Sequence, residues 1–436
     1  MARLNECILY RNFEHGEILD KMAELMNAWE QKAPDLKEKE GLFFECANGL
    51  VETAGSYGFS GNLWHCYLTF LLVNNENAFS TACEIRGAVN GSINELALND
   101  FGVFKELYDF DLTVLDEAFG ISCCKVLGDY TNTGSNSKMF NSRIRDRICD
   151  LSKTLAAAES TEEFMKDMVQ FYKDFGVGKL GLHKAFRVGH DENDNVEIQP
   201  ITRIAHVKLE DLVGYEIPKQ KLIENTEAFV RGRKANNCLL FGDAGTGKSS
   251  SIKGILNRYY DEGLRIIEVY KHQFQDLNDV IAQIKNRNYK FIIYMDDLSF
   301  EEFEIEYKYL KAVIEGGLEK KPDNILIYAT SNRRHLIKET WNDRNDVETQ
   351  NGMHRSDTME EKLSLVNRFG VTINYSKPSQ KEYFHIVVEL ARKNGVTEEQ
   401  MSDEQLRAEA NKWELSHGGI SGRTAQQFIN YILGTL

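Results

Sequence analysis

Residues 238–249 read CLLFGDAGTGKS, a short apolar run that passes into a glycine-rich turn ending in lysine and serine. Gly242, Gly247, Lys248 and Ser249 satisfy the pattern G-x-x-x-x-G-K-[ST]. In this pattern the glycines let consecutive backbone N–H groups curl around phosphate oxygens, the helix that follows points its positive end at them, and the lysine reaches the outer phosphates. The stretch therefore predicts a strand, a phosphate-binding loop and a helix, in that order.

The expected nucleotide contacts extend through the whole loop into the first turn of the helix. They are Gly242, Asp243, Ala244, Gly245, Thr246, Gly247, Lys248, Ser249 and Ser250. Ser249 would in addition offer its hydroxyl to a Mg²⁺ ion bound with the phosphates. A nucleoside triphosphate carrying magnesium is thus the ligand that this pattern favours.

Residues 290–297, KFIIYMDD, form the second informative segment. A continuous apolar run is typical of a strand buried on both faces, and Asp296 and Asp297 come at its carboxyl end, where parallel sheets bind their ligands. Asp296 is expected to hold the Mg²⁺, and Asp297 to orient or deprotonate an attacking water. By themselves the two aspartates would read as an exposed strand end. The phosphate loop upstream favours the functional interpretation.

Apolar runs and helical patterns alternate through the second half of the chain. The runs lie at 238–242, 264–270, 290–297, 324–332 and 370–376. This alternation predicts an α/β fold, a mostly parallel sheet with helices on both faces. We expect the sheet domain to span 203–376 and a helical lid to follow it over 377–436.

The first part of the chain is predicted to be a separate, mainly helical domain over 1–180. No proline occurs between Pro34 and Pro200, so that helix breaker is missing from a long stretch. The clearest helix begins at Ser160 with a capping-box pattern. Residues 181–202 read as a hairpin that links the two parts. Because nothing in the first part resembles a catalytic set, we expect it to recognise an unknown protein partner.

Charge, cysteine usage and hydropathy limit the cellular compartments and the kinds of partner that fit this sequence. Lys and Arg total 52 against 67 for Asp and Glu, a formal net charge of −15, which argues against a protein that coats nucleic-acid phosphates. Arg333, Arg334 and His335 form the largest local basic cluster of the sheet domain, but a sensor loop that faces phosphate or a neighbouring subunit is favoured over a contact with nucleic acid. Nucleic acid is therefore possible but not indicated. None of the 8 cysteines is in C-x-x-C spacing, and no signal peptide or membrane span is visible. A cytoplasmic protein with no membrane partner is expected.

Further motifs occur in the order found in the AAA+ ATPases, which the chain resembles from about 195 to 436. They are EDLVGY at 210–215, MDDLSF at 295–300, ATSNRRH at 329–335, NRFG at 367–370 and SGRTAQQF at 421–428. More narrowly, the chain looks like a bacterial AAA+ family catalogued as an uncharacterised ATP-binding domain, in which DDLSF, ATSNRRHL and SGRTA recur. The resemblance implies an AAA+ P-loop core with a C-terminal helical lid, and ATP as the nucleotide.

The resemblance also implies a role for each matching residue. Val213, Gly214 and Tyr215 match the segment that borders the adenine. Asn332 matches the polar residue called sensor 1, whose amide holds the water or the outer phosphate. Arg423 matches sensor 2, which reaches the same nucleotide from the helical lid.

Arg368, in NRFG, matches the arginine finger, a cation that one subunit gives to its neighbour's site to neutralise charge on the transferred phosphoryl group. The resemblance therefore implies a homo-oligomer. The chain also departs from the superfamily pattern in two ways. Asp297 stands where most AAA+ proteins have glutamate, one methylene longer, so hydrolysis could be slow. Around Tyr270 and Phe274, no aromatic-x-Gly loop follows the second strand, so threading of a polypeptide is unsupported.

The sequence leaves three functions open. The first is magnesium-dependent ATP hydrolysis by an oligomeric AAA+ ATPase that remodels a protein or protein complex. The second is a nucleotide-gated switch or loader acting on a nucleic-acid-bound complex. The third is an ATP-binding interaction module with little turnover, which Asp297 would tolerate but against which Asn332, Arg368 and Arg423 argue.

Overall fold

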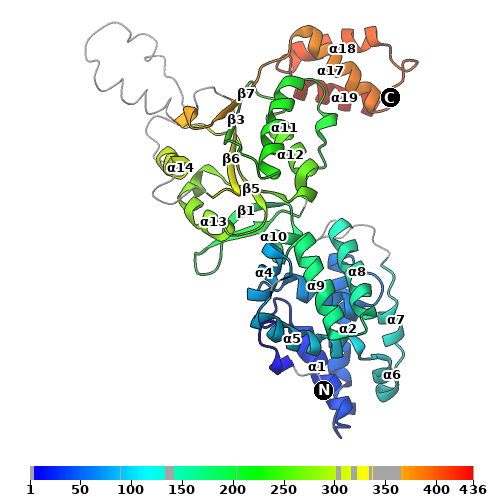
Figure 1. Cartoon of the computed structure of the whole chain (residues 1–436). Coiled ribbons are helices and arrows are strands. Elements are labelled where there is room, and N and C mark those ends of the chain that lie inside the picture. The colour runs from blue at the N-terminus through cyan, green and yellow to red at the C-terminus, as the bar shows by residue number, and fades with distance from the viewer. Residues whose placement is uncertain are drawn as a thin grey trace. The chain divides into compact units, whose positions relative to one another are not determined.

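The computed structural model of the chain (Figure 1) describes residues 4–88, 90–132, 142–202, 204–300, 306–315, 322–332, 336 and 365–435. The chain divides into two compact units, Met1–His183 and Lys184–Leu436. None of the helices in the described ranges combines the length and apolar character needed to cross a membrane.

The first unit is helical, as predicted. Its α-helices are α1 (Glu17–Glu30), α2 (Glu40–Tyr57), α3 (Leu63–Asn74), α4 (Ala78–Arg86), α5 (Ser92–Asp109), α6 (Thr113–Phe119), α7 (Cys124–Gly128), α8 (Ser142–Ala157), α9 (Thr161–Phe175) and α10 (Gly178–Leu182). Short 3₁₀ turns lie at Leu4–Glu6 and Leu36–Lys39. These helices enclose one apolar core.

Local sequence explains how individual helices of this unit begin and pack. The side chain of Ser160 accepts a hydrogen bond from the Glu163 N–H and so caps α9. On α3 nearly every side chain is buried, which is typical of a central helix surrounded by others. Its Trp64 indole donates to the Leu107 carbonyl at 2.9 Å, which ties α3 to α5.

The second unit is built on a seven-stranded sheet. The strands are β1 (Ala185–His190), β2 (Val196–Pro200), β3 (Cys238–Gly242), β4 (Leu264–Glu268), β5 (Lys290–Met295), β6 (Ile325–Ser331) and β7 (Val371–Tyr375). The helices are α11 (Glu216–Val230), α12 (Lys248–Tyr259), α13 (Leu277–Ile284), α14 (Glu306–Glu315), α17 (Gln380–Lys393), α18 (Asp403–Ser416) and α19 (Gly422–Thr435). 3₁₀ turns lie at Leu209–Asp211, Tyr260–Glu262 and Lys271–Asp276.

The strand order is β2-β1-β4-β5-β6-β3-β7, and every pairing is parallel except that of β1 with β2. Leu222 of α11 and Ile255 of α12 are buried with strand residues in one core. Figure 1 shows α13 and α14 on the other side of the sheet. Strands buried on both faces explain the continuous apolar runs, and the predicted α/β class is confirmed.

The hairpin expected between the two parts of the chain belongs to the sheet. Its β1 strand pairs in parallel with β4, with Phe186 opposite Ile267. The division between the two units falls after His183, so the hairpin extends the edge of the second unit.

A helical lid follows β7, also as predicted. Helices α17, α18 and α19 share a core of their own, in which Tyr383, Leu406 and Phe428 are buried. Val213 and Tyr215, which precede α11, pack against that core. The segment that the resemblance assigns to the adenine therefore lies where the lid meets the sheet domain.

Candidate active site

The phosphate loop connects β3 to α12, as its sequence predicts. Gly242, the last residue of β3, has a φ of +135°, and a Cβ built on it would lie 2.2 Å from the Tyr375 carbonyl oxygen. Gly247, which directly precedes α12, has a φ of +89°. L-residues with a side chain rarely adopt these conformations. The glycines are thus required for the loop to turn, and α12 begins at Lys248 with its free N–H groups facing the loop.

Replacing Gly242 with alanine is expected to destabilise the second unit by about 2–3 kcal/mol, since the side chain is incompatible with both the backbone conformation and the neighbouring carbonyl. Gly434→Ala is the matched control. A Cβ at Gly434, inside α19, meets nothing within 4 Å, so this change should raise helix stability slightly. Thermal unfolding followed by circular dichroism checks both. Equal melting temperatures for the two variants would contradict the expected strain.

The Lys248 side chain is folded back onto its own loop. Its Nζ donates to the Gly242 carbonyl at 2.9 Å, the Asp243 carbonyl at 2.6 Å and Asn332 Oδ1 at 3.0 Å. Burial lowers the pKa of the Lys248 amine, although the carboxylates of Asp243, Asp297 and Asp296 act in the opposite direction. The cation thus lies at the loop with carbonyl and amide oxygens as its partners.

The Asp296 carboxylate receives hydrogen bonds from three hydroxyl groups. Ser249, Tyr294 and Thr330 donate to Asp296 Oδ1 at 2.8, 2.7 and 2.6 Å respectively. Burial would raise the pKa of this carboxyl, but the bonds from Thr330, Tyr294 and Ser249 outweigh it and hold the pKa below its ordinary value. An ionised carboxylate next to the Ser249 hydroxyl is a pair of hard oxygen ligands that suits Mg²⁺. These residues therefore fit the predicted metal ion.

The Asp297 carboxylate lies beside the proposed metal ligand. Its Oδ1 accepts a hydrogen bond from Asn332 Nδ2 at 2.7 Å, so Asn332 joins Asp297 to Lys248 through the two ends of one amide. The backbone of Asp297 has a φ of +51°, in the left-handed region. Its N–H donates to Thr330 Oγ1 at 2.9 Å. The carboxyl end of β5 thus presents two fixed carboxylates next to the phosphate loop.

A cavity of about 680 Å³ lies over these groups. Predicted site residues that line it are Val213, Tyr215, Ala244, Gly245, Thr246, Gly247, Lys248, Ser249, Ser250, Asp296, Asp297, Asn332 and Arg423. The lid closes one side, where the Arg423 N–H donates to the Gly245 carbonyl at 3.0 Å. The structure therefore brings residues from five distant stretches of sequence into one cavity.

Four predicted residues lie outside the lining of this cavity. Gly242 and Asp243 contribute their carbonyls to Lys248, as described above, and Gly214 lines a neighbouring cavity. Arg368 forms an ion pair with Glu315, with 2.6 Å between Nη2 and Oε1. Of the segment ATSNRRH, Arg333, Arg334 and His335 are outside the described residues.

Several residues that line or support the cavity were missed by sequence reasoning. Ile386 and Leu390 of α17 form an apolar part of its wall. Lys219 of α11 donates to the Leu212 carbonyl at 2.6 Å and so fixes the segment before Tyr215. Thr330 belongs to the segment ATSNRRH. The signal that could have identified it is its place on β6, the strand next to the one that ends in Asp296. Lys219 had none, because nothing local distinguishes it from other helical lysines.

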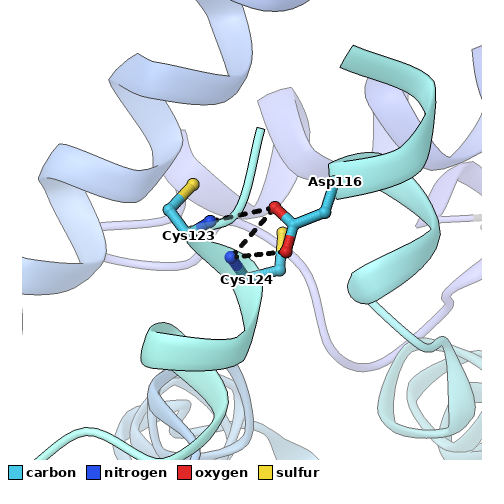
Figure 2. Close-up of side chains that lie close together, drawn as sticks. All are labelled: Asp116, Cys123 and Cys124. Carbon is cyan, nitrogen blue, oxygen red and sulfur yellow. Dashed lines mark hydrogen bonds between the residues drawn. The ribbon is translucent and has the colours of Figure 1, made fainter. Parts of the chain in front are cut away.

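The first unit contains a second cluster of polar side chains (Figure 2). The ligand atoms of Asp116, Cys123 and Cys124 lie within 4.8 Å of one another. Both carboxylate oxygens of Asp116 accept backbone N–H groups, from Cys123 and Cys124 at 3.1 Å. Figure 2 shows the Cys123 sulfur pointing away from the carboxylate, and burial together with Asp116 raises the pKa of the Cys124 thiol. Asp116 therefore serves as a cap for the start of α7.

Parts of the chain are similar to known proteins. The sequence profile of the family described as "Protein of unknown function (DUF815)" matches residues 182–436. A comparison with curated proteins gave no match. Among solved structures, the RuvB Holliday junction branch migration motor of Thermotoga maritima is similar with a TM-score of 0.31 and 14% sequence identity, over 51% of this chain and 71% of that chain. A point variant of the same RuvB has a TM-score of 0.32 and 15% identity over the same shares.

Proposed function

The chain belongs to the family described as "Protein of unknown function (DUF815)", whose match spans all of the candidate site, and we propose that it is a magnesium-dependent ATPase of the AAA+ class. The observation that carries this proposal is the convergence of the phosphate loop, two carboxylates and a lid arginine on one cavity. A site that only bound nucleotide would not need a second carboxylate next to the metal ligand.

Each polar residue of the site has a part in the proposed reaction. Lys248 and the N–H groups of its loop would bind the β- and γ-phosphates. Ser249 and Asp296 would hold Mg²⁺, which neutralises phosphate charge when bound. Asp297 would orient the attacking water and accept its proton, while Asn332 binds the outer phosphate.

Adenine is the base that we expect in the apolar part of the cavity. Val213, Ile386 and Leu390 line it, and the Tyr215 ring stacks on Tyr375, with ring centroids 5.6 Å apart. An apolar wall with an aromatic edge suits a flat purine ring. Gly214, which lines the neighbouring cavity, has a φ of +82°, and a Cβ there would lie 3.4 Å from Ile386 Cδ1, so a side chain would be strained beside this wall.

We further propose that the enzyme works as a homo-oligomer. Arg368 lies away from the cavity of its own subunit and is paired with Glu315. A cation placed there supports a role in a neighbour's site, where it would contact the outer phosphate together with that subunit's Arg423. ATP turnover would then depend on assembly.

Remodelling of a protein or protein complex in the cytoplasm is the use of ATP that we favour, with the helical first unit recognising the target. Of the two aromatic residues after β4, Phe274 is buried and Tyr270 is 48% exposed. A single exposed aromatic side chain offers little support for threading. A nucleotide-gated switch or loader on a nucleic-acid-bound complex, and an ATP-binding module with little turnover, are the alternatives.

Removal of magnesium provides the direct test of the proposed activity. We expect EDTA to reduce ATP hydrolysis to background, because Asp296 and the phosphates would then face each other without a bridging cation. Phosphate release measures the rate, and the same sample with excess Mg²⁺ added over the EDTA is the control. Hydrolysis that continues in EDTA would contradict the proposed role of Ser249 and Asp296.

A further inference from the structure

We propose that Thr330 is a positioning residue that sets the geometry of both carboxylates of the site at once. This inference rests on the proposed function, because it concerns the residues that would hold Mg²⁺ and activate water. Thr330 lies near the end of β6 and is only 1% exposed. It is absent from every role that the sequence motifs assign.

The Thr330 side chain binds two successive residues of the facing strand end. Its Oγ1 donates to Asp296 Oδ1 at 2.6 Å and accepts the Asp297 N–H at 2.9 Å. The backbone amide of Asp297 can only donate, so Thr330 Oγ1 is the acceptor of that bond. The hydroxyl proton of Thr330 is therefore directed at the Asp296 carboxylate. One oxygen atom therefore fixes the orientation of one aspartate side chain and the backbone of the next.

The main chain of Thr330 makes a third contact with the same turn. Its carbonyl accepts the Leu298 N–H at 2.7 Å. Asp297 thus lies between two hydrogen bonds to one residue, and it is in this short segment that the backbone takes a φ of +51°. A left-handed conformation is unfavourable for a non-glycine residue unless its surroundings hold it. Thr330 stabilises this conformation through two hydrogen bonds, one from the Asp297 N–H to its side chain and one from the Leu298 N–H to its carbonyl.

This backbone conformation has a direct consequence for the chemistry. An aspartate has one fewer rotatable side-chain bond than a glutamate, so the direction of its carboxylate follows the backbone more closely. The Asp297 carboxylate reaches Asn332 Nδ2 at 2.7 Å from this conformation. If the Thr330 contacts were lost, Asp297 would be free to leave the left-handed region, and its carboxylate would move away from the outer phosphate.

The choice of threonine also has a physical reason. A β-branched side chain in a strand has a restricted χ1 angle, so its hydroxyl direction is well defined. Valine has nearly the same shape but can neither donate nor accept a hydrogen bond. Serine keeps the hydroxyl and loses only the methyl group. Thr330→Val and Thr330→Ser therefore separate hydrogen bonding from packing.

Two measurements test the inference. The first is the affinity of the site for Mn²⁺, as a probe of the Mg²⁺ position, measured by electron paramagnetic resonance with a non-hydrolysable ATP analogue present. We expect Thr330→Val to weaken Mn²⁺ binding roughly tenfold, Thr330→Ser to stay within about threefold of the wild type, and nucleotide affinity in EDTA to be unchanged. The second is kcat for ATP at saturating Mg²⁺, which we expect Thr330→Val to lower by roughly 10- to 100-fold.

Thr226→Val is the matched control, because Thr226 is also fully buried in the second unit, and its hydroxyl contacts the Leu222 carbonyl of its own helix and the Tyr328 hydroxyl of β6 but neither aspartate of the site. Thermal unfolding shows whether any variant has lost its fold. A Thr330→Val variant that matches the wild type in Mn²⁺ affinity and kcat overturns the inference while the proposed ATPase stands. A wild type that hydrolyses no ATP refutes the proposed function, and the Mn²⁺ measurement then decides the role of Thr330 toward Asp296 alone.

Discussion

Lys248→Ala is expected to weaken ATP binding at least about 100-fold, or roughly 3 kcal/mol, and to reduce hydrolysis to background. The amine is the cation nearest to the loop carbonyls and Asn332, so no other side chain of the loop can replace its charge on the outer phosphates. Titration with a fluorescent ATP analogue measures the affinity, and phosphate release measures the rate. The fold should be kept, since the lysine contributes to loop contacts and not to the apolar core.

Lys253→Ala is the matched control for this experiment. Lys253 lies on the same helix, α12, and is exposed, so its removal changes the net charge equally without touching the loop. We expect it to bind and hydrolyse ATP as the wild type does. If both variants bound ATP equally well, the phosphate loop would not be the nucleotide site.

Arg368→Ala is expected to bind ATP normally and to lose about 1000-fold or more in kcat, the range measured for arginine fingers supplied by a partner. Its activity should return in part when it is mixed with Lys248→Ala. In such a mixture, the Arg368→Ala subunit supplies an intact loop and the Lys248→Ala subunit supplies an intact finger, so complete sites form at half of the possible mixed interfaces. Neither variant alone contains a complete site.

The mixing experiment is measured as phosphate release against the ratio of the two variants at constant total concentration. A bell-shaped curve is expected, together with a specific activity of the wild type that rises with protein concentration. Arg407→Ala, an exposed arginine of α18, serves as the control for loss of a surface cation. A flat curve at the level of the blank, or an Arg368→Ala variant as active as the wild type, would argue against a finger acting between subunits.

The parts of the site that could be predicted are those in which local sequence determines geometry. A loop whose glycines occupy left-handed positions between a strand and a helix has few alternative conformations, so residues 242–249 were identified in the correct structural context. Asp296 was predictable because carboxyl ends of parallel strands share one edge of the sheet. The contacts of Thr330 were not, because they depend on which strands are neighbours and on their register, and both are set by long-range packing. The contact of Tyr294 with Asp296 is local, since the two residues are two positions apart and lie on one face of the strand end.

The hairpin at 185–200 illustrates the same limit. Its two strands and polar turn are visible in sequence, since adjacent segments specify that pairing. The parallel pairing of β1 with β4 joins residues that are about 80 positions apart. No local sequence pattern predicts a pairing over that separation. The ion pair between Arg368 and Glu315 is similar, because it connects the segment before β7 to the end of α14.

The hydrogen bonds that link Lys248, Asn332 and Asp297 imply that nucleotide binding is an exchange of partners. The Lys248 amine already donates to three oxygen acceptors, and the Asn332 amide already donates to the Asp297 carboxylate. Each contact that ATP makes with Lys248 must replace one of these, because the ammonium has three donors and all are used, so affinity reflects a difference between two sets of bonds and not a sum of new ones. ADP, which lacks the outer phosphate, would leave the pair of Asn332 and Asp297 together. The protein thus carries its own internal competitor for the γ-phosphate, and that competitor would lower the affinity for ATP without lowering the affinity for ADP.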